Sequence, residues 1–599
     1  MNILGRIKLP SSADVSSLYV HCNEGATINY PEADKKIMLH QGGIISLNSY
    51  FNSVYENFYA KYTKLDSIYY LLKLEGDFEV SLYREVYEGN NRELIAKEKF
   101  EQCHLSDDVK VLVPNLRSTE AIGRIYLSII CLSDQGVLKE GVIATDQAKT
   151  SEVSLGIISC TFKKEAYIRN TVHTILQDKL LQTKEFKIFI VDNGRSLSES
   201  DFSSPKVQLI SNKNVGGSGG FTRGLIEALE SNAYSHFLFM DDDIELDSES
   251  IYRLFTLYEY AKSDFAVAGS MLDLSKKHFL YEAGSLRDKN NTYRTAPLKH
   301  NLELETSNSL NFLLLEENLD YGGFWFFAFS KKLIEEIGLP MPFFIKVDDI
   351  EFGLRIKESV NSKIVAFPAI AVWHEPFYAK YPIWDNYYTY RNCLINNAIH
   401  GSLGYNNVIK DTTNVLIVLL LFFEYNSAEL TVKAFEDYLK GPDFLKTNAP
   451  EILHYNILKL SKSYNNQNIQ QNYLPPNQVE PKSRAGSLKK IVSLLTLNGH
   501  LLPNFLTSDD EVFVSLGPSN PGQRVQAFAK KRVNIFREGS ACLYQNDIDK
   551  MAGIRLLTRW FKLAARSSIK WSSISTEWKN ASKELTSTSF WQQYLGLKE

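Results

Sequence analysis

The sequence predicts a multidomain α/β protein with an N-terminal β-sandwich, a central α/β domain and a C-terminal helical region. Its 599 residues suit about two to four domains. Short β-rich segments fill the first part of the chain, strand-like and helix-like segments alternate in the middle, and helical patterns dominate the end. These three stretches, 1–150, 151–400 and 401–599, are the predicted domains.

Residues 1–150 are expected to form the β-sandwich. Segments 67–74, 110–113 and 123–131 are short and β-rich, and Gly, Asn and Asp separate them. Regular short strands with such turn signals are typical of sandwiches. A domain of this kind binds carbohydrate or supports its neighbour, and we favour support.

Residues 151–400 alternate between apolar strands and helices, which predicts βαβ units and a mostly parallel sheet. The strands are short apolar runs, as expected where helices cover both faces of a sheet. The predicted strands are 153–160, 186–191, 208–210 and 237–240, and the predicted helices are 165–180 and 224–229.

Residues 401–599 are expected to be mainly helical, with helices at 414–425 and 428–439. The stretch 464–487 is rich in Asn, Gln, Pro and Ser, which predicts a mobile loop. Near the C-terminus, tryptophans mix with basic residues. Such a segment can lie on an anionic membrane, although it is more often a helix packed on its own domain. The residues concerned are Trp560, Trp571, Trp578 and Trp591, with Lys550, Arg555, Arg559, Lys562, Arg566 and Lys570.

Composition excludes several classes of function. The net charge of −4 provides no basic field for nucleic acid. The six cysteines lack CxxC spacing, which argues against a zinc cluster or a disulfide framework and fits a reducing cytosol. No signal peptide is evident, and the longest apolar run, 415–423, is far shorter than the about 20 residues of a membrane span. We therefore expect a cytoplasmic protein, either soluble or peripheral at a membrane.

Three consecutive carboxylates, Asp241, Asp242 and Asp243, follow the apolar run 237–240. Ligands bind at the carboxyl ends of such strands, and carboxylates suit a hard cation such as Mn2+ or Mg2+. A cation there could hold a diphosphate. The alternative is a polar loop before a helix capped by Asp247 and Ser248.

Two further features fall in the same α/β stretch. Asp192 ends a predicted strand, where it could accept hydrogen bonds from uracil or ribose or simply cap a turn. The stretch 214–224 holds closely spaced glycines, including Gly216 and Gly217, whose backbone N–H groups could face phosphate, with Arg223 adding charge. A tight strand–helix turn is the alternative, which the glycine density disfavours.

Aromatic and acidic residues further along the chain are also candidate site residues. Gly323 beside Trp325 suggests backbone and indole placed against a flat ligand such as a sugar, rather than an ordinary buried strand. Asp348 and Asp349 begin a predicted helix, where a carboxylate is either stabilised by the helix dipole or acts as a general base for a sugar hydroxyl. His374 is structural or a third metal ligand beside the aspartates.

This ordered set resembles the family 2 glycosyltransferases with the GT-A fold. The runs 214–221, 344–349 and 371–374 are similar to those of the bacterial galactofuranosyltransferases. The resemblance implies an N-terminal β-sandwich, a central GT-A domain with a Rossmann-like mixed sheet and a C-terminal helical region. One departure is that mycobacterial members have paired tryptophans where this chain has Phe324 and Trp325, so the acceptor or linkage can differ.

The resemblance also implies roles for these residues. Asp241, Asp243 and His374 would hold Mn2+ or Mg2+. Asp349 would be the catalytic base. The remaining roles are donor or acceptor positioning by Asp348, acceptor binding by Trp325 with Gly323, and nucleotide binding by Asp192, Asn214, Gly216, Gly217, Arg223 and Asp242.

The function so implied is an inverting, metal-dependent transfer of galactofuranose from UDP-galactofuranose to a hydroxyl of a cell-surface glycan of the O-antigen, capsule or galactan type. The partners would be the UDP-sugar donor and a glycan acceptor on a lipid carrier, reached by peripheral contact of the C-terminal region with the inner face of the cytoplasmic membrane. Nucleic acid is not an expected partner, and a homo-oligomer is left open.

Three alternatives remain. The stretch 387–392 also occurs in bacterial rhamnosyltransferases of the same superfamily, which would use dTDP-rhamnose. A non-catalytic glycan-binding protein would use the β domain and aromatic clefts, but the acidic clusters argue against it. A nucleotidyltransferase is disfavoured because no basic motif for a triphosphate is visible.

Overall fold

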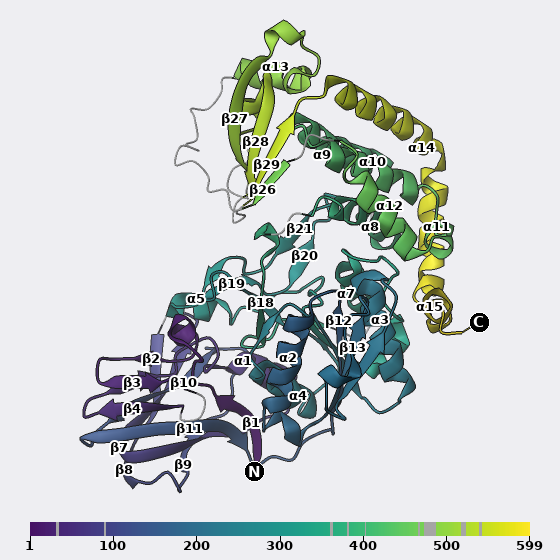
Figure 1. The fold of residues 1–599 in the computed structure, drawn as a ribbon. Helices are drawn as coiled ribbons and strands as arrows, with labels where there is room; N and C mark the ends of the chain where they lie inside the picture. The colour runs from purple at the N-terminus through teal and green to yellow at the C-terminus, as the bar shows by residue number, and fades with distance from the viewer. Residues whose placement is uncertain are drawn as a thin grey trace.

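The computed structural model describes residues 1–31, 35–88, 91–359, 363–379, 382–401, 403–464, 468–471, 487–516, 523–537 and 542–598. Figure 1 shows a sheet-rich N-terminal region, a central α/β region and a mainly helical C-terminal region. The change in character near residues 150 and 400 supports three domains, and their boundaries remain our proposal.

The N-terminal region is built around one long strand, β7 (Ile68–Val86). At Gly76 its backbone has a φ of +111°, and a Cβ there would lie 2.6 Å from the Ser133 hydroxyl oxygen. Before this residue β7 pairs with β9 and β11, and after it β7 pairs with β8 and β10. The eleven strands therefore form one connected network, which confirms a sheet-rich region while the two-sheet sandwich stays a prediction.

The elements of this region are short except for β7, β8 and β11. They are β1 (Asn2–Ile7), β2 (His21–Cys22), β3 (Ala26–Asn29), β4 (Lys36–His40), β5 (Ile44–Ser46), β6 (Val54–Tyr55), α1 (Glu56–Tyr62), β8 (Asn91–Cys103), β9 (Val109–Val113), β10 (Gly123–Cys131) and β11 (Gln135–Thr145).

The central region contains a seven-stranded mixed sheet in the order β14-β13-β12-β15-β23-β17-β24. Its first four strands are parallel, and β23 runs antiparallel to both neighbours. The strands are β12 (Ser154–Thr161), β13 (Glu185–Asp192), β14 (Val207–Ser211), β15 (His236–Met240), β17 (Ala266–Ala268), β23 (Phe326–Ser330) and β24 (Ile364–Val365). Apart from the edge strand β14, which is mostly half-buried, these strands are largely buried on both faces, which confirms the prediction from continuous apolar runs.

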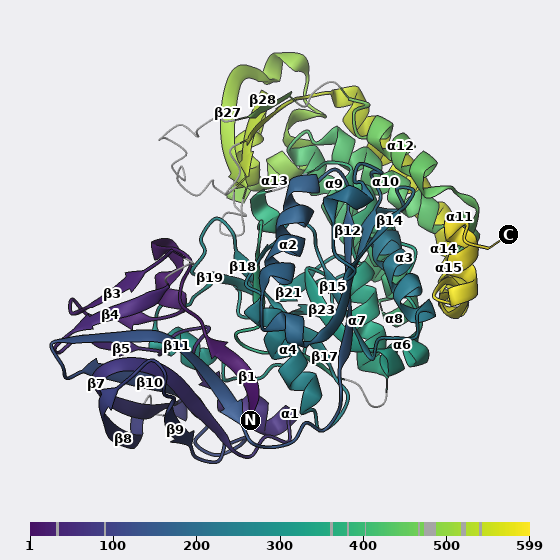
Figure 2. The ribbon, with the colours of Figure 1, turned by 60° about the horizontal axis from the view of Figure 1, so that its bottom comes forward.

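A second, five-stranded sheet in the order β16-β25-β18-β19-β22 stands beside the first. Its strands are β16 (Glu245–Leu246), β18 (Ser270–Asp273), β19 (Phe279–Glu282), β22 (Leu302–Glu303) and β25 (Ala371–His374), and β20 (Ser285–Arg287) pairs with β21 (Thr295–Pro297). The helices are α2 (Glu165–Gln177), α3 (Gly216–Glu230), α4 (Glu249–Glu259), α5 (Ser307–Phe312), α6 (Lys331–Ile337) and α7 (Asp348–Glu358). Figure 2 shows α2 and α3 against the sheet of β12 and β15.

The C-terminal region is mainly helical, as predicted, but it also contains a four-stranded sheet that the sequence analysis did not predict. Its strands are β26 (Asn468–Gln471), β27 (Ser508–Leu516), β28 (Lys530–Arg537) and β29 (Cys542–Asp547). Its helices are α8 (Asp385–His400), α9 (Tyr405–Leu421), α10 (Tyr425–Tyr438), α11 (Asp443–Thr447), α12 (Pro450–Leu460), α13 (Ser487–Leu495), α14 (Lys550–Leu585) and α15 (Thr588–Leu595). Strand β26 falls in the stretch predicted as a loop, most of which lies outside the described residues.

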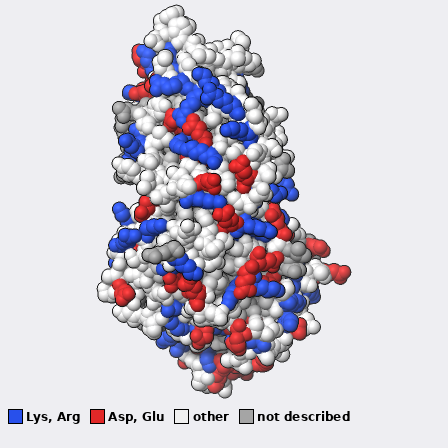
Figure 3. All heavy atoms as spheres, turned by 90° about the vertical axis from the view of Figure 1, so that its right-hand side faces the viewer, with Lys and Arg blue, Asp and Glu red and all other residues white. Residues whose placement is uncertain are grey.

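The C-terminal tryptophans are core residues, which agrees with the favoured interpretation of helices packed on their own domain rather than with the membrane alternative. Trp560, Trp578 and Trp591 are fully buried and donate their indole N–H to Thr413, Tyr438 and Pro340 respectively. Trp571 packs against Tyr405 and Phe435. The basic residues of α14 lie outside, and Figure 3 shows Lys and Arg side chains gathered over the upper part of the face that bears this helix. Among the described helices, none combines the length and the apolar character that crossing a bilayer demands.

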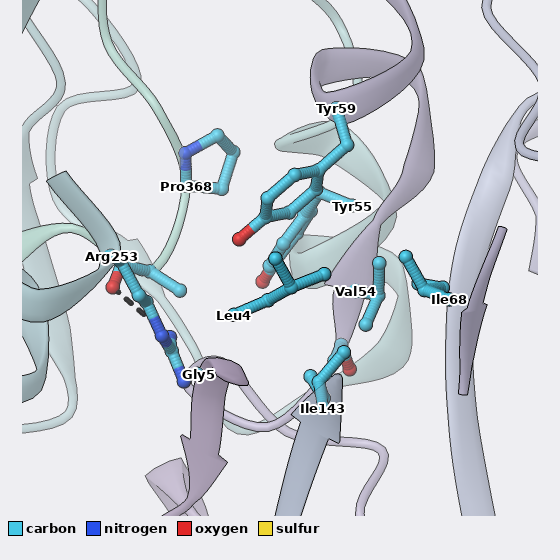
Figure 4. A pocket seen from close by; sticks show the side chains of 11 residues that line it. Leu4, Gly5, Val54, Tyr55, Tyr59, Ile68, Ile143, Arg253 and Pro368 are labelled. Atoms are coloured by element: carbon cyan, nitrogen blue, oxygen red, sulfur yellow. Dashed lines mark hydrogen bonds between the residues drawn. The ribbon is translucent and has the colours of Figure 1, made fainter. Parts of the chain in front are cut away.

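A seam of hydrogen bonds and ion pairs joins the N-terminal strand β1 to the central region. The Arg6 guanidinium donates to Asp178 at 2.6 Å and to Glu249 at 2.6 Å, and both carboxylates are buried. Beside it, an apolar pocket lies between β1, α1 and α4 (Figure 4). The charged group in its wall, Arg253, already donates to the Ala369 carbonyl at 3.2 Å, so we interpret the pocket as a packing seam rather than a binding site.

Arg6→Ala is expected to lower the free energy of unfolding by about 3 kcal/mol, because it leaves the buried Asp178 without its cation and Glu249 with Arg253 alone. Thermal or urea unfolding followed by circular dichroism would measure this. Arg169→Ala is the matched control: its partner Asp201 is partly exposed, so the expected loss is within about 1 kcal/mol. Equal melting of the two variants would contradict the interpretation of the seam.

Candidate active site

The carboxylates predicted to act together converge at the carboxyl ends of the parallel strands. β12, β13 and β15 run side by side, with Thr161 opposite Asp192 and Ile158 opposite Phe239, so Asp192 and the triplet after Met240 reach the same edge. The buried thiol of Cys160 reports this convergence, because burial and then the charges of Asp242, Asp241, Asp192 and Asp348 raise its pKa well above the ordinary value.

His374 reaches the triplet through strand pairing. The short strand β16 begins two residues after Asp243 and pairs with β25, with Glu245 opposite Trp373. This register places the Nε2 atom of His374 3.4 Å from a carboxylate oxygen of Asp243 and 3.8 Å from one of Asp241.

These three side chains form a set that could hold a cation. One ligand atom from each of Asp241, Asp243 and His374 lies within 4.8 Å of the others. Two carboxylates and an imidazole suit Mn2+ or Mg2+, and they fit the cation that the resemblance implies. Lys164, just before α2, forms an ion pair with Asp243, and the sequence analysis did not anticipate it. Asp242 is buried, and burial together with Asp243 raises its pKa to about 7.

Asp348 and Asp349 begin helix α7 as predicted. Burial raises the pKa of both carboxyls, and their mutual repulsion adds to the effect on Asp348, whose pKa is raised further. Lys346 opposes the shift of Asp349, and the charge of Asp241 adds to it. The Asp pair and the Asp-Asp-His set therefore interact electrostatically across one site.

The backbone before the pair is strained. Phe344, Lys346 and Val347 have φ angles of 72°, 68° and 70°, in the left-handed region. Such a conformation costs a non-glycine residue roughly 1–3 kcal/mol, and Val is among the residues it suits least. Strain of this kind needs surrounding contacts that hold it, and it is common beside functional groups.

A buried glutamate also faces the pair, and the sequence analysis missed it. Glu282 ends β19, accepts a hydrogen bond from Ser285 at 3.2 Å, and has a pKa raised to about 8 by burial, with Asp349 adding to the shift. Nothing local in the sequence marks Glu282, because only the fold brings β19 next to α7.

The glycine-rich stretch is the start of helix α3 rather than a loop. The helix begins at Gly216, eight residues before the predicted start, because the glycines allow close packing. A Cβ at Gly216 would lie 2.0 Å from the Phe344 carbonyl oxygen, and one at Gly220 would lie 2.0 Å from the Cys160 sulfur. Gly217 has open space instead, so it is the glycine with room for a ligand near its backbone.

The predicted nucleotide contacts have protein partners in this structure. Asp192 accepts three backbone N–H bonds, from Gly194, Ser196 and Leu197 at 2.6 to 2.9 Å, so it braces the loop that follows β13. The Asn214 side chain accepts from the Gly216 N–H at 3.1 Å. Arg223 forms an ion pair with Glu227, one turn along α3. Binding of uridine by Asp192 and Asn214 and of phosphate by Arg223 remains a prediction.

Trp325 lies behind the His374 ring instead of forming an open wall. Its indole is 4% exposed, donates to the Gly269 carbonyl at 3.0 Å and lies 6.3 Å from the imidazole. A Cβ at Gly323 would lie 2.1 Å from the same indole, so this glycine makes room for Trp325. Acceptor binding by Trp325 and Gly323 remains a prediction. In this structure the Trp325 indole packs behind the His374 ring, and Gly323 packs against the indole.

The raised pKa of Asp349 predicts the acid limb of the pH–activity profile. A base works only when ionised, so activity should rise with pH through a midpoint above the about 4 of a free carboxyl. Burial and the charge of Asp241 raise this midpoint, and Lys346 lowers it. The other titratable groups near Asp349 are Asp348, Glu282, Tyr321 and Cys393. The midpoint would be measured as kcat against pH at saturating metal and donor. Nucleotide binding should be measured over the same pH range, because loss of the metal would weaken it whereas titration of the base would not. A midpoint near 4 would contradict a buried base.

Comparison with known proteins agrees with this geometry. The model described as glycosyltransferase like family 2 matches residues 154–387, and the one described as galactofuranosyltransferase 2 N-terminal matches 4–145. Galactofuranosyltransferase GlfT2 of Mycolicibacterium smegmatis is 27% identical over 99% of this chain and 96% of its own. GlfT2 of Mycobacterium tuberculosis is 28% identical over 74% of this chain and 73% of its own.

A solved mannosyltransferase of Pyrobaculum calidifontis, in complex with GDP-Man and Mn2+, overlaps 53% of this chain and 84% of its own, at a TM-score of 0.28 and 11% identity. That overlap is too low to add to the assignment, which rests on the matched sequence families and on the relative that spans nearly the whole chain. The chain is a hexosyltransferase that matches the family 2 glycosyltransferases over residues 154–387 and is similar to the galactofuranosyltransferases along its length.

Proposed function

We propose that the chain transfers galactofuranose from UDP-galactofuranose to a hydroxyl of a cell-surface glycan, with inversion and with the help of a divalent cation. The observation that carries the proposal is the single edge of the sheet where a cation-binding set, Asp241, Asp243 and His374, meets the buried pair Asp348 and Asp349. The choice of sugar is supported by the names of the two curated relatives.

The reaction is one displacement. Asp241, Asp243 and His374 would hold Mn2+ or Mg2+, which when bound offsets the negative charge of the diphosphate. The acceptor oxygen forms a bond to the anomeric carbon as the bond from that carbon to the phosphate oxygen breaks, and the bonding electrons leave with UDP. Asp349 takes the proton of the acceptor hydroxyl. Asp348, which burial and repulsion keep neutral near pH 7, can donate a hydrogen bond to a sugar oxygen.

Titration calorimetry with UDP, UMP and dTDP, each with and without Mn2+, tests the donor half of this proposal. We expect Mn2+-dependent binding of UDP that exceeds that of UMP and dTDP, followed by turnover of UDP-galactofuranose. A preference for dTDP and turnover of dTDP-rhamnose would support the rhamnosyltransferase alternative. Glycan binding without any nucleotide binding would overturn both.

We further propose that the enzyme works at the inner face of the cytoplasmic membrane and contacts it through an apolar surface on α13 and the loop that follows. This surface consists of seven large side chains, each more than half exposed: Leu488, Ile491, Leu494, Leu495, Leu501, Phe505 and Leu506. Helix α13 therefore turns an apolar face outward, which is the reverse of a helix packed on a globular core.

Charge favours a lipid surface with anionic headgroups as the occupant. From Ser487 to Ser508 the chain carries Lys489 and Lys490 and no acidic residue, and α14 has only basic charges before Glu577. The two parts adjoin, since the Lys550 ammonium donates to the Asn504 side chain at 2.7 Å. Exposed apolar residues beside basic residues are typical of surfaces that rest on anionic membranes.

Co-sedimentation with vesicles of phosphatidylglycerol and phosphatidylcholine tests this surface. The double substitution Ile491→Asp and Leu495→Asp should reduce binding by about tenfold or more, because it places charge where acyl chains would be. Leu112→Asp, at an equally exposed leucine on β9, should bind like the wild type. If the wild-type protein does not bind vesicles and the double variant has a different oligomeric state, a second copy of the chain covers the surface.

A further inference from the structure

The segment 341–347 joins the two halves of the proposed site. It leads directly into Asp348 and Asp349, and it contains the three strained residues described above. On one side it contacts the start of α3: the Ser218 N–H donates to the Phe344 carbonyl at 3.1 Å, and the Ser218 hydroxyl donates to the Met341 carbonyl. Gly216 has no room for a side chain because the Phe344 carbonyl lies there.

On its other side, two buried residues of α8 hold the same segment. The amide nitrogen of Asn392 lies 3.2, 3.0 and 2.9 Å from the carbonyl oxygens of Phe343, Ile345 and Lys346, which share its two hydrogens. Arg391 donates to the Phe343 carbonyl at 2.9 Å and to the Asn392 side-chain oxygen at 2.9 Å, which fixes the orientation of the amide.

These two residues are buried between α8 and the segment. Both are at most 1% exposed, and their polar atoms face backbone carbonyls that the unusual φ angles turn away from regular pairing. Such carbonyls need donors when buried, and a strained segment persists only where its surroundings over-determine it. An amide that spans three carbonyls and an arginine that locks the amide provide that constraint.

We infer that Asn392 and Arg391 are positioning residues that hold segment 343–347 in its strained form and thereby place the base Asp349 to reach the acceptor hydroxyl. The inference rests on the proposed function for the role of Asp349 and goes beyond it in assigning a role to the stretch 387–392. Because the segment also contacts the start of α3, the same clamp joins the base to the helix that carries Gly217.

Asn392→Ala tests the clamp, with Asn397→Ala as its matched control. Asn397 is also a buried asparagine on α8, and its amide donates to the Leu403 carbonyl at 3.0 Å, outside the segment. For Asn392→Ala we expect kcat to fall by about tenfold or more, since small misplacements of a reacting group have effects of this size, while the donor KM stays within about threefold. Amide hydrogen exchange of residues 344–350 should accelerate in Asn392→Ala and not in Asn397→Ala.

Three results would overturn the clamp: a kcat within about twofold of the wild type, an equal fall in Asn397→Ala, or unchanged exchange at 344–350. If Asn392→Ala does not fold, Arg391→Lys replaces it, because lysine keeps the charge but cannot donate to both acceptors of the guanidinium at once. Failure of the proposed function is a separate outcome. Wild-type protein that does not transfer galactofuranose would refute that proposal, and the exchange comparison would still decide the clamp.

Discussion

Asp349→Asn is expected to lower kcat by about 10²- to 10⁴-fold, the usual contribution of a general base, with little change in UDP affinity. Asparagine keeps the shape of the side chain and can still accept the 2.8 Å bond from the Ile350 N–H. It cannot take the proton of the acceptor hydroxyl. The loss should therefore fall on the transfer step, measured as kcat with a defined acceptor, while calorimetry reports unchanged Mn2+-dependent UDP binding.

Asp348→Asn is the control that separates the two carboxyls. Because Asp348 has the more strongly raised pKa and is neutral near pH 7, an amide there removes little charge, and a smaller fall in kcat is expected. Because Asp348 is already neutral where Asp349 titrates, the acid limb of the pH profile of this variant should stay close to that of the wild type. A larger loss in Asp348→Asn than in Asp349→Asn would reassign the base to Asp348.

The central sheet and the acidic groups could be predicted because local sequence patterns mark them. β12 lies within one residue of the predicted strand at both ends, since a strand covered on both faces must be apolar throughout. Asp192, Asp241–Asp243 and Asp348–Asp349 stand at element ends that the apolar pattern marks. Parallel pairing then brings the first two to one edge without further information.

Other features depend on contacts between distant parts of the chain. Helix α3 begins at Gly216 against the intrinsic preference of glycine, because its glycines fit against Cys160 and the Phe344 backbone. β26 and β29 pair across more than 70 residues, so neither segment is recognisable as a sheet strand from its own sequence. The amphipathic spacing of α14 shows that one face is apolar, but not that Trp560 and Trp578 face α9 and α10 instead of a membrane.

Asp243→Ala is expected to abolish the metal-dependent part of UDP binding, the second large effect. Changes outside the ligand set of a metal cost about 10- to 100-fold in affinity, so removing a ligand should cost at least as much. Titration of Mn2+ by electron paramagnetic resonance measures the loss directly, without turnover. Asp242→Asn is the control, because that neighbouring side chain lies outside the set of three and is already partly neutral near pH 7.

Lys164 provides a second test of the metal site, because its ammonium pairs with Asp243, one of the residues that would hold the cation. Binding of a cation must displace or rearrange that ammonium, so Lys164→Met should tighten Mn2+ binding in the absence of nucleotide while Asp243→Ala abolishes it. Opposite effects of the two substitutions on the same titration would place the cation beside Asp243. If Asp243→Ala kept wild-type Mn2+ affinity, the set of Asp241, Asp243 and His374 would not be the metal site.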